Sequence, residues 1–205
     1  MSEKAVIGAG PAAVEEAIKV LRHSGVVAFP TETYYGLAVE PTDTAALARL
    51  FALKQRPESK PLLLLIDQLD QLMEVVSEIP KEYRRLIEMF WPGPLTLIFP
   101  ARPEVSPLVT GGTGTVGVRI SPHPVARELV RRVGRPVTAT SANLSGRSPA
   151  ASAEEVIAQF GEKIDWIIDG GPASGGLCST VCTLERGKLV VLRRGQVVLP
   201  SELLD

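Results

Sequence analysis

Two short segments of the chain carry side chains that suit a ligand with several negative charges. Residues 29–37 (FPTETYYGL) place hydroxyl groups directly after an apolar run, and residues 53–57 (LKQRP) place Lys54 and Arg56 at the end of a predicted helix. Hydroxyl groups and cations are the donors that phosphate oxygens accept hydrogen bonds from. Phosphate chemistry is therefore the first hypothesis for this chain.

The two cations also have a plainer explanation. The dipole of a helix stabilises a cation at its C-terminus by about 0.3–1 kcal/mol, and Pro57 ends the helix here. Lys60 adds a third cation four residues after Arg56, just before a second apolar run. On residue chemistry alone, ligand binding and helix stabilisation explain this cluster equally well.

Three further loops have a similar composition. Residues 138–146 (TATSANLSG) predict a strand that runs into a loop rich in hydroxyl and amide groups. Residues 110–115 and 170–180 combine glycines with hydroxyl groups. Ordinary turns use the same residue types, but ligands of open α/β sheets bind at strand ends. We therefore treat these loops as candidate binding loops.

The elements that position these loops follow from hydrophobic periodicity and from helix start and stop signals. We expect helices over residues 11–21, 43–55, 67–76, 80–90 and 124–133, and one that begins at Ser152 with a capping box to Glu155. We expect strands over residues 25–29, 61–66, 95–99, 115–120, 136–140, 166–168, 179–184 and 189–192. Strands and helices mix without a regular βαβ rhythm, which predicts an α/β domain with a mixed, twisted sheet.

The totals favour one globular domain over residues 1–205, with a core at about 11–195 and a short C-terminal tail. Hydrophobic residues make up 45% of the chain and the net charge is −1, which argues against extensive binding to a phosphate backbone. The longest apolar run, residues 62–66, is too short to span a bilayer. The first residues lack a signal-peptide pattern. We therefore expect a cytoplasmic protein with no membrane contact.

Several familiar site patterns are weak or missing. His23 and His123 have no convincing Ser or Cys partner, so a hydrolase triad is not expected. Cys178 and Cys182 have no zinc-ligand company, and we expect both to be buried and inert. Two strings, residues 8–13 and 112–117, match a dinucleotide-binding pattern only as isolated matches. A cluster of arginines is expected to form a solvated helix face, with tRNA contact as the alternative: Arg127, Arg131, Arg132 and Arg135.

Taken in order, the segments resemble the YrdC family of threonylcarbamoyl-AMP synthases, called TsaC in the short form. The matching segments are residues 29–37 (FPTETYYGL), 53–57 (LKQRP), 60–62 (KPL), 91–96 (WPGPLT), 115–119 (TVGVR), 141–146 (SANLSG), 168–171 (IDGG) and 179–180 (ST). One such match is weak, but the ordered set over nearly the whole chain is specific. The family's KxR…SxN signature falls on Lys54, Arg56, Ser141 and Asn143.

The resemblance implies a YrdC-like fold, an open twisted mixed sheet with flanking helices around a large cavity. It implies that L-threonine, bicarbonate and ATP give threonylcarbamoyl-AMP and pyrophosphate, for threonylcarbamoyladenosine (t6A) modification of tRNA by a downstream transferase complex. Mg²⁺ is expected to arrive with ATP, held mainly by phosphates and water, with no protein metal site. A direct contact with tRNA is a further partner to consider.

The resemblance also assigns roles to individual residues. Lys54 and Arg56 are the expected catalytic cations. ATP binding is expected from Lys54, Arg56, Lys60, Thr115, Ser141, Asn143, Arg193 and Arg194. Threonine binding is expected from Thr31, Arg119 and Ser179, with Arg119 on the carboxylate of threonine.

The chain departs from the family pattern at two places. Many relatives carry a histidine in the strand after KPL, where this chain has Leu65. Two-domain relatives continue beyond the region that ends here, so we expect the single-domain form. Two other functions remain open: a non-catalytic module that binds double-stranded RNA or tRNA, and an enzyme that forms a carbamoyl adenylate from carbamoyl phosphate.

Overall fold

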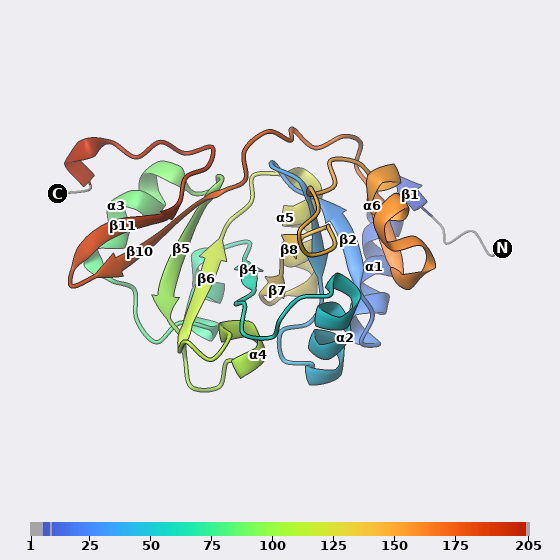
Figure 1. Cartoon of the computed structure of the whole chain (residues 1–205), viewed down its shortest axis with the longest axis horizontal. Helices are drawn as coiled ribbons and strands as arrows, with labels where there is room; N and C mark the ends of the chain where they lie inside the picture. The colour runs from blue at the N-terminus through green and yellow to red at the C-terminus, as the bar shows by residue number, and fades with distance from the viewer. Residues whose placement is uncertain (1–5, 9, 204–205) are drawn as a thin grey trace.

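The computed structural model describes residues 6–8 and 10–203. Two twisted mixed sheets lie side by side and helices flank them (Figure 1). The helices are α1 (Pro11–Arg22), α2 (Thr44–Lys54), α3 (Lys81–Phe90), α4 (Pro107–Thr110), α5 (Pro124–Val133) and α6 (Ala153–Phe160). Short 3-10 turns lie at Leu69–Glu74, Gly161–Lys163 and Ser201–Leu203.

The first sheet is five-stranded and has the order β1-β9-β2-β3-β8. Its strands are β1 (Val6–Gly8), β9 (Trp166–Asp169), β2 (Val27–Pro30), β3 (Tyr35–Ala38) and β8 (Thr140–Ser141). Strands β1 and β2 run parallel to β9, whereas β3 is antiparallel to both β2 and β8. The hairpin between β2 and β3 carries the PTET segment at its tip.

The second sheet is six-stranded and has the order β11-β10-β5-β6-β4-β7. Its strands are β11 (Lys188–Arg193), β10 (Thr180–Glu185), β5 (Leu95–Pro100), β6 (Thr115–Arg119), β4 (Leu63–Leu65) and β7 (Val137–Thr138). Parallel pairs, β10 with β5 and β4 with β6, alternate with antiparallel pairs. The predicted mixed, twisted α/β architecture is confirmed, with the strands shared between two sheets.

The chain passes from one sheet to the other at Ala139. We predicted one strand over residues 136–140, but β7 pairs with β4 and β8 pairs with β3. The Ala139 backbone N–H donates to the Leu63 carbonyl at 2.8 Å before the chain turns to the other sheet. This crossover joins one edge of each sheet, and the candidate loops of both sheets meet beside it.

Local sequence signals explain most of the element ends. Asp43 caps α2 by accepting a hydrogen bond from the Ala46 N–H at 3.0 Å, and Gln55 ends the helix in the left-handed region at φ 50°. Helix α5 covers the predicted residues 124–133. The segment 67–76 forms a 3-10 turn over Leu69–Glu74 instead of an α-helix. Strands β1 and β3 and helix α4 were not predicted.

One apolar core spans both sheets. It includes Val26 and Tyr35 from the first sheet and Leu64, Leu97 and Val118 from the second, each fully or almost fully buried. A second cluster packs α1 and α5 against the outer face of the first sheet. Within the part of the chain that the structure describes, no helix combines the length and apolar character needed to cross a membrane.

Candidate functional site

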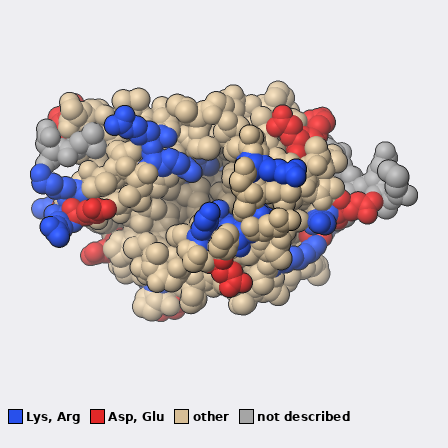
Figure 2. All heavy atoms as spheres, in the orientation of Figure 1, with Lys and Arg blue, Asp and Glu red and all other residues tan. Residues whose placement is uncertain are grey.

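A cavity of about 250 Å³ lies where the two sheets meet. Figure 2 shows the face of the molecule hollowed at this point, with Lys and Arg side chains around the hollow. Six of the predicted site residues line the cavity: Thr31, Arg56, Arg119, Ser141, Ser179 and Arg193. Ligand pockets usually measure about 300–1,000 Å³, so the prediction of a large cavity is not confirmed.

The charges around the cavity have one sign. Its lining includes three arginines, Arg56, Arg119 and Arg193, and contains no aspartate or glutamate among the described residues. Apolar groups such as Leu63 and Ile98 complete the wall. Three arginines around one cavity favour an anionic ligand, although Arg119 is paired with Glu32, a carboxylate that lies outside the lining. The predicted polyanion site is therefore supported by the way the fold brings these residues together.

Lys54 lies outside the cavity lining, in the last turn of α2. Its side chain is only 1% exposed, and its Nζ donates to the Ser141 carbonyl and to the Asn143 carbonyl, the latter at 2.8 Å. Burial, helped by the neighbouring Arg56, lowers the pKa of Lys54 to about 7. Lys54 thus fixes the backbone of the SxN loop from behind.

The SxN loop is further held by its own side chains. The Ser141 hydroxyl donates to the Asn143 Oδ1 at 2.5 Å, and the Asn143 amide donates to the carbonyls of Leu144 and Arg147, both at 2.9 Å. Ser141 lines the cavity, whereas Asn143 does not. Asn143 therefore shapes the loop, and Ser141 is the member of the signature that reaches the ligand space.

Arg56 brings a cation to the cavity from the segment after α2. Its Nη2 donates to the Pro61 carbonyl at 2.9 Å, and its Nε donates to the Lys60 carbonyl at 3.4 Å. Partial burial lowers the pKa of its guanidinium. Arg56 lines the cavity and Lys54 does not, so Arg56 is the cation of the KxR pair that can reach an anion there.

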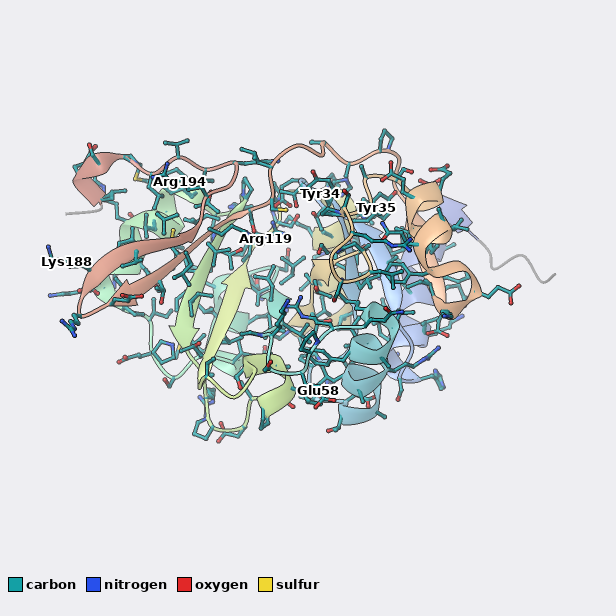
Figure 3. All side chains as sticks on the ribbon, in the orientation of Figure 1. Tyr34, Tyr35, Glu58, Arg119, Lys188 and Arg194 are labelled. Atoms are coloured by element: carbon teal, nitrogen blue, oxygen red, sulfur yellow. The ribbon has the colours of Figure 1, made fainter. Side chains whose placement is uncertain are left out.

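Arg119, at the end of β6, is the most buried charge of the site. Its side chain is 4% exposed, and its Nη1 lies 2.7 Å from the Glu32 Oε1. Burial lowers the pKa of Arg119, and the Glu32 carboxylate opposes that shift. Although the ion pair is close, its geometry makes no hydrogen bond to Oε1, and the Arg119 Nε has no hydrogen-bond partner among the described residues. The Arg119 side chain, labelled in Figure 3, also lines the cavity, so its guanidinium can meet a ligand there.

Ser179 links Thr96 to Arg193 in the wall of the cavity. Its hydroxyl lies 3.1 Å from the Thr96 Oγ1 and accepts a hydrogen bond from the Arg193 Nη2 at 2.9 Å. The Arg193 Nε donates to the Ser179 carbonyl at 3.1 Å. Arg193 thus holds Ser179 in place, and buried Thr96, which was not among the predicted site residues, belongs to the same network.

Thr31 lies at the tip of the β2–β3 hairpin. Its hydroxyl donates to the Tyr34 carbonyl at 2.6 Å and lies 3.1 Å from the Thr33 hydroxyl. Thr31 and Thr33 are both buried and both line the cavity. The hairpin is therefore closed by the same hydroxyl groups that it presents to the ligand space.

Besides Lys54 and Asn143, three predicted site residues lie away from the cavity lining. Lys60 is exposed after α2, and Arg194 is exposed after β11, where Figure 3 labels it. Thr115 begins β6, and its hydroxyl lies 2.9 Å from the Thr113 hydroxyl. Leu65, at the position where relatives carry histidine, is fully buried and is also absent from the lining.

The cysteine prediction is correct for one residue and wrong for the other. Cys182 is buried, and burial raises the pKa of its thiol to about 11. Cys178 is half-buried and lines the cavity, because it immediately precedes Ser179 in an irregular segment. The arginines on α5, which we expected to form a solvated face, each make an ion pair, for example Arg127 with Asp67 at 3.0 Å.

A carboxylate is the second site feature that the residue assignments missed. Glu32 stands between Thr31 and Thr33, and its side chain is 12% exposed. The sequence signal for Glu32 was a charged residue inside a hydroxyl-rich segment that follows a buried strand.

Within residues 6–8 and 10–203, no group of three or more His, Cys, Asp or Glu side chains could hold a metal ion.

Comparisons with known proteins agree on one family. The family model Sua5_yciO_yrdC, described as Telomere recombination, matches residues 19–195. The threonylcarbamoyl-AMP synthase of Bacillus subtilis (strain 168) is 40% identical over 185 residues, which cover 90% of this chain and 54% of that protein. The enzyme of the same name from Idiomarina loihiensis is 44% identical over 156 residues, which cover 74% of this chain and 84% of that one.

A solved structure gives the same result in three dimensions. The crystal structure of P. abyssi Sua5 complexed with L-threonine superposes with a TM-score of 0.90 at 40% identity, over 93% of this chain and 57% of that chain. The chain thus spans about half the length of the Bacillus subtilis and P. abyssi proteins that it matches.

Proposed function

Because the chain belongs to the Sua5/YciO/YrdC family, we propose that it is an L-threonylcarbamoyladenylate synthase. In this reaction L-threonine, bicarbonate and ATP give threonylcarbamoyl-AMP and pyrophosphate. The relatives of that name, and the threonine complex of the P. abyssi protein, support the proposal. The observation that carries it is the buried Arg119, whose side chain lines one cavity together with two more arginines.

The threonine end of the cavity is built around Arg119. A planar guanidinium suits a carboxylate, because two parallel N–H donors match its two oxygens. Thr31 and Ser179 line the same cavity and can bind the amine or the hydroxyl of threonine. We infer that Arg119 binds the carboxylate of L-threonine and that these two hydroxyl groups orient the rest of the amino acid.

The phosphate end of the cavity is built around Arg56 and Ser141. The amine of threonine and bicarbonate condense to a carbamate with loss of one water. A carbamate oxygen then attacks the α-phosphate of ATP, and pyrophosphate leaves with the bonding electrons. The nucleophile is already an anion, so this step needs no Ser-His or Cys-His pair. The protein must position the reactants and neutralise charge on the phosphates.

The remaining ATP residues divide into two groups. Lys54 and Asn143 act from behind the cavity by holding the SxN loop, so their loss should disturb Ser141. For Lys60, Thr115 and Arg194, a role in binding ATP stays a prediction. Mg²⁺ would arrive with ATP and be held mainly by phosphates and water.

The product would be used by a downstream transferase complex for t6A modification of tRNA. A reaction that consumes ATP and supplies tRNA modification belongs in the cytoplasm, which is where we place the protein. Direct tRNA contact is not required for the adenylation step, since all three substrates are small molecules.

Pyrophosphate release tests the proposal directly. We expect release with ATP, L-threonine and bicarbonate together, and only background release when threonine or bicarbonate is omitted. Release that depends on carbamoyl phosphate instead would support the carbamoyl-adenylate enzyme. Salt-sensitive binding of double-stranded RNA, with no threonine-dependent release, would support the RNA-binding module.

A further inference from the structure

The buried pair of Glu32 and Arg119 contains a residue whose function is not yet assigned. We propose that Glu32 is a positioning residue, which holds the Arg119 guanidinium in the orientation that binds the carboxylate of L-threonine. The proposal rests on the proposed function. It assigns to Glu32 a role exerted through Arg119, because Arg119 lines the cavity and Glu32 does not.

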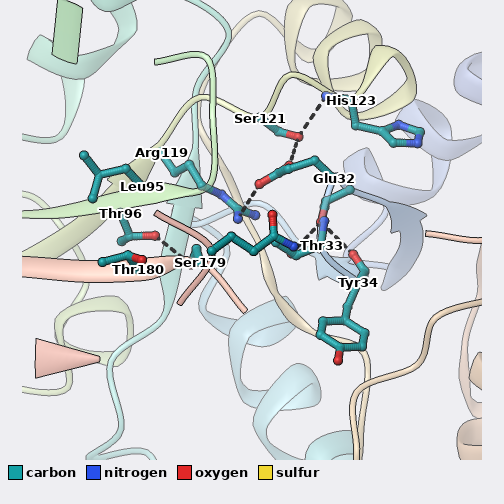
Figure 4. Close-up of polar contacts among 12 residues, drawn as sticks. Glu32, Thr33, Tyr34, Leu95, Thr96, Arg119, Ser121, His123, Ser179 and Thr180 are labelled. Atoms are coloured by element: carbon teal, nitrogen blue, oxygen red, sulfur yellow. Dashed lines mark hydrogen bonds and ion pairs between the residues drawn. The ribbon is translucent and has the colours of Figure 1, made fainter. Parts of the chain in front are cut away.

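The Glu32 carboxylate is anchored at the oxygen that does not face Arg119. Its Oε2 accepts a hydrogen bond from the Ser121 hydroxyl, and the Ser121 Oγ in turn accepts one from the His123 backbone N–H at 3.2 Å (Figure 4). Ser121 is only 2% exposed. The start of α5 therefore fixes the carboxylate, and the carboxylate fixes the guanidinium.

Apart from Glu32, the described residues give the Arg119 guanidinium few polar contacts that could hold it. The ion pair with Glu32, 2.7 Å between Nη1 and Oε1, is its only salt bridge among them, and its Nε has no hydrogen-bond partner there. A guanidinium with five N–H donors and one counter-ion can turn when that counter-ion is lost. Its orientation in the cavity therefore depends on Glu32.

An alternative role for the Glu32–Arg119 pair is to stabilise the fold alone. A buried ion pair is a weak source of stability, because desolvation of both charges offsets their attraction. This pair also leaves the Glu32 Oε1 and the Arg119 Nε without hydrogen bonds inside the described protein. Because the Arg119 side chain lines the cavity, a pair that adds little stability suits the role of holding this guanidinium for a ligand.

The experiment compares Glu32→Ala, Glu32→Gln and wild type by steady-state pyrophosphate release. Glutamine keeps the shape of the side chain and can keep a carbonyl oxygen beside the Arg119 Nη1, whereas alanine removes the contact. We expect Glu32→Ala to raise the KM for L-threonine at least tenfold, with the KM for ATP and kcat within threefold of wild type. Glu32→Gln should stay within threefold for all three parameters.

Two further variants sharpen the comparison. Ser121→Ala keeps the ion pair but removes the anchor, so we expect a threefold to fivefold rise in the threonine KM and no added effect on top of Glu32→Ala. Asp67→Ala is the matched control, because Asp67 is an equally shielded carboxylate that pairs with Arg127 on α5, outside the cavity lining. It should leave the threonine KM unchanged. If Glu32→Ala does not fold, Ser121→Ala alone decides the test.

Several results would overturn the positioning role. These are an unchanged threonine KM in Glu32→Ala and Ser121→Ala, equal rises in the KM values for threonine and ATP, and tighter threonine binding in both Glu32 variants. The last would mean that the carboxylate acts by its charge and not by holding Arg119. Calorimetric titration with L-threonine repeats the comparison without turnover. A wild-type protein that neither binds threonine nor releases pyrophosphate would overturn the proposed function as well.

Discussion

Replacement of Lys54 by methionine should change how the stability of the protein depends on pH. Lys54 is 1% exposed, and its Nζ donates only to backbone carbonyls in the SxN loop among the described residues. Burial and the nearby Arg56 lower its pKa from 10.5 to about 7 in the folded protein. In the unfolded chain the amine returns to about 10.4.

The sign and size of the effect follow from these two pKa values. Between pH 7 and pH 10 the unfolded chain binds more protons than the folded protein, so the free energy of unfolding rises with pH. The full slope is about 1.4 kcal/mol per pH unit, and it is smaller near pH 7, where half of the folded molecules are protonated. From pH 7 to pH 9 wild type should therefore gain about 2 kcal/mol relative to Lys54→Met.

Urea unfolding of both proteins at pH 6, 7, 8 and 9 measures this difference. The control is Lys19→Met, which removes an exposed lysine of α1 and should shift the free energy of unfolding by a constant amount over the same range. Parallel curves for wild type and Lys54→Met would refute the reasoning, because they would mean that Lys54 carries its proton equally well in both states.

Three further predictions concern the cavity. Arg56→Ala should lower kcat/KM for ATP at least tenfold, by the loss of about 1.5–3 kcal/mol from a charged hydrogen bond, with little change in melting temperature; near-wild-type turnover would contradict its role. A thiol-alkylating reagent should modify one thiol per folded chain, at half-buried Cys178 and not at buried Cys182, as peptide mapping by mass spectrometry can show; equal labelling of both would be inconsistent with the structure. Gly117→Ala would place a Cβ 3.1 Å from the end of the Ile98 side chain and should weaken ligand binding at least fivefold in calorimetry, at a cost of about 1 kcal/mol in stability; unchanged affinity would show that this wall does not contact the ligand.

Much of the fold could be predicted from local sequence. Helix α5 matches its predicted range because Pro124 at its first position and Gly134 after its end are strong signals. The segment 136–140 could not be predicted correctly, because its division at Ala139 depends on partners far away in the chain, β4 and β3. Strands that change sheets carry no local signal for the change.

The candidate site was predictable in its residue types and less so in its geometry. The pattern identified Arg56, Arg119 and Ser141, which the fold brings to one cavity. It also identified Lys54, but it did not indicate that this side chain lies outside the cavity lining and donates to two carbonyls of the SxN loop. Glu32 was missed because its proposed role depends on its ion pair with Arg119, which is 87 residues away in the sequence.

The measurement that tests the central claim most directly is mass spectrometry of the adenylate formed from ATP, L-threonine and ¹³C-bicarbonate. The account predicts an adenylate that contains threonine and gains one mass unit from the labelled carbon. It also predicts loss of that product in Arg119→Ala, a variant that should still bind ATP. An unlabelled adenylate, no adenylate, or equal product from Arg119→Ala would contradict it.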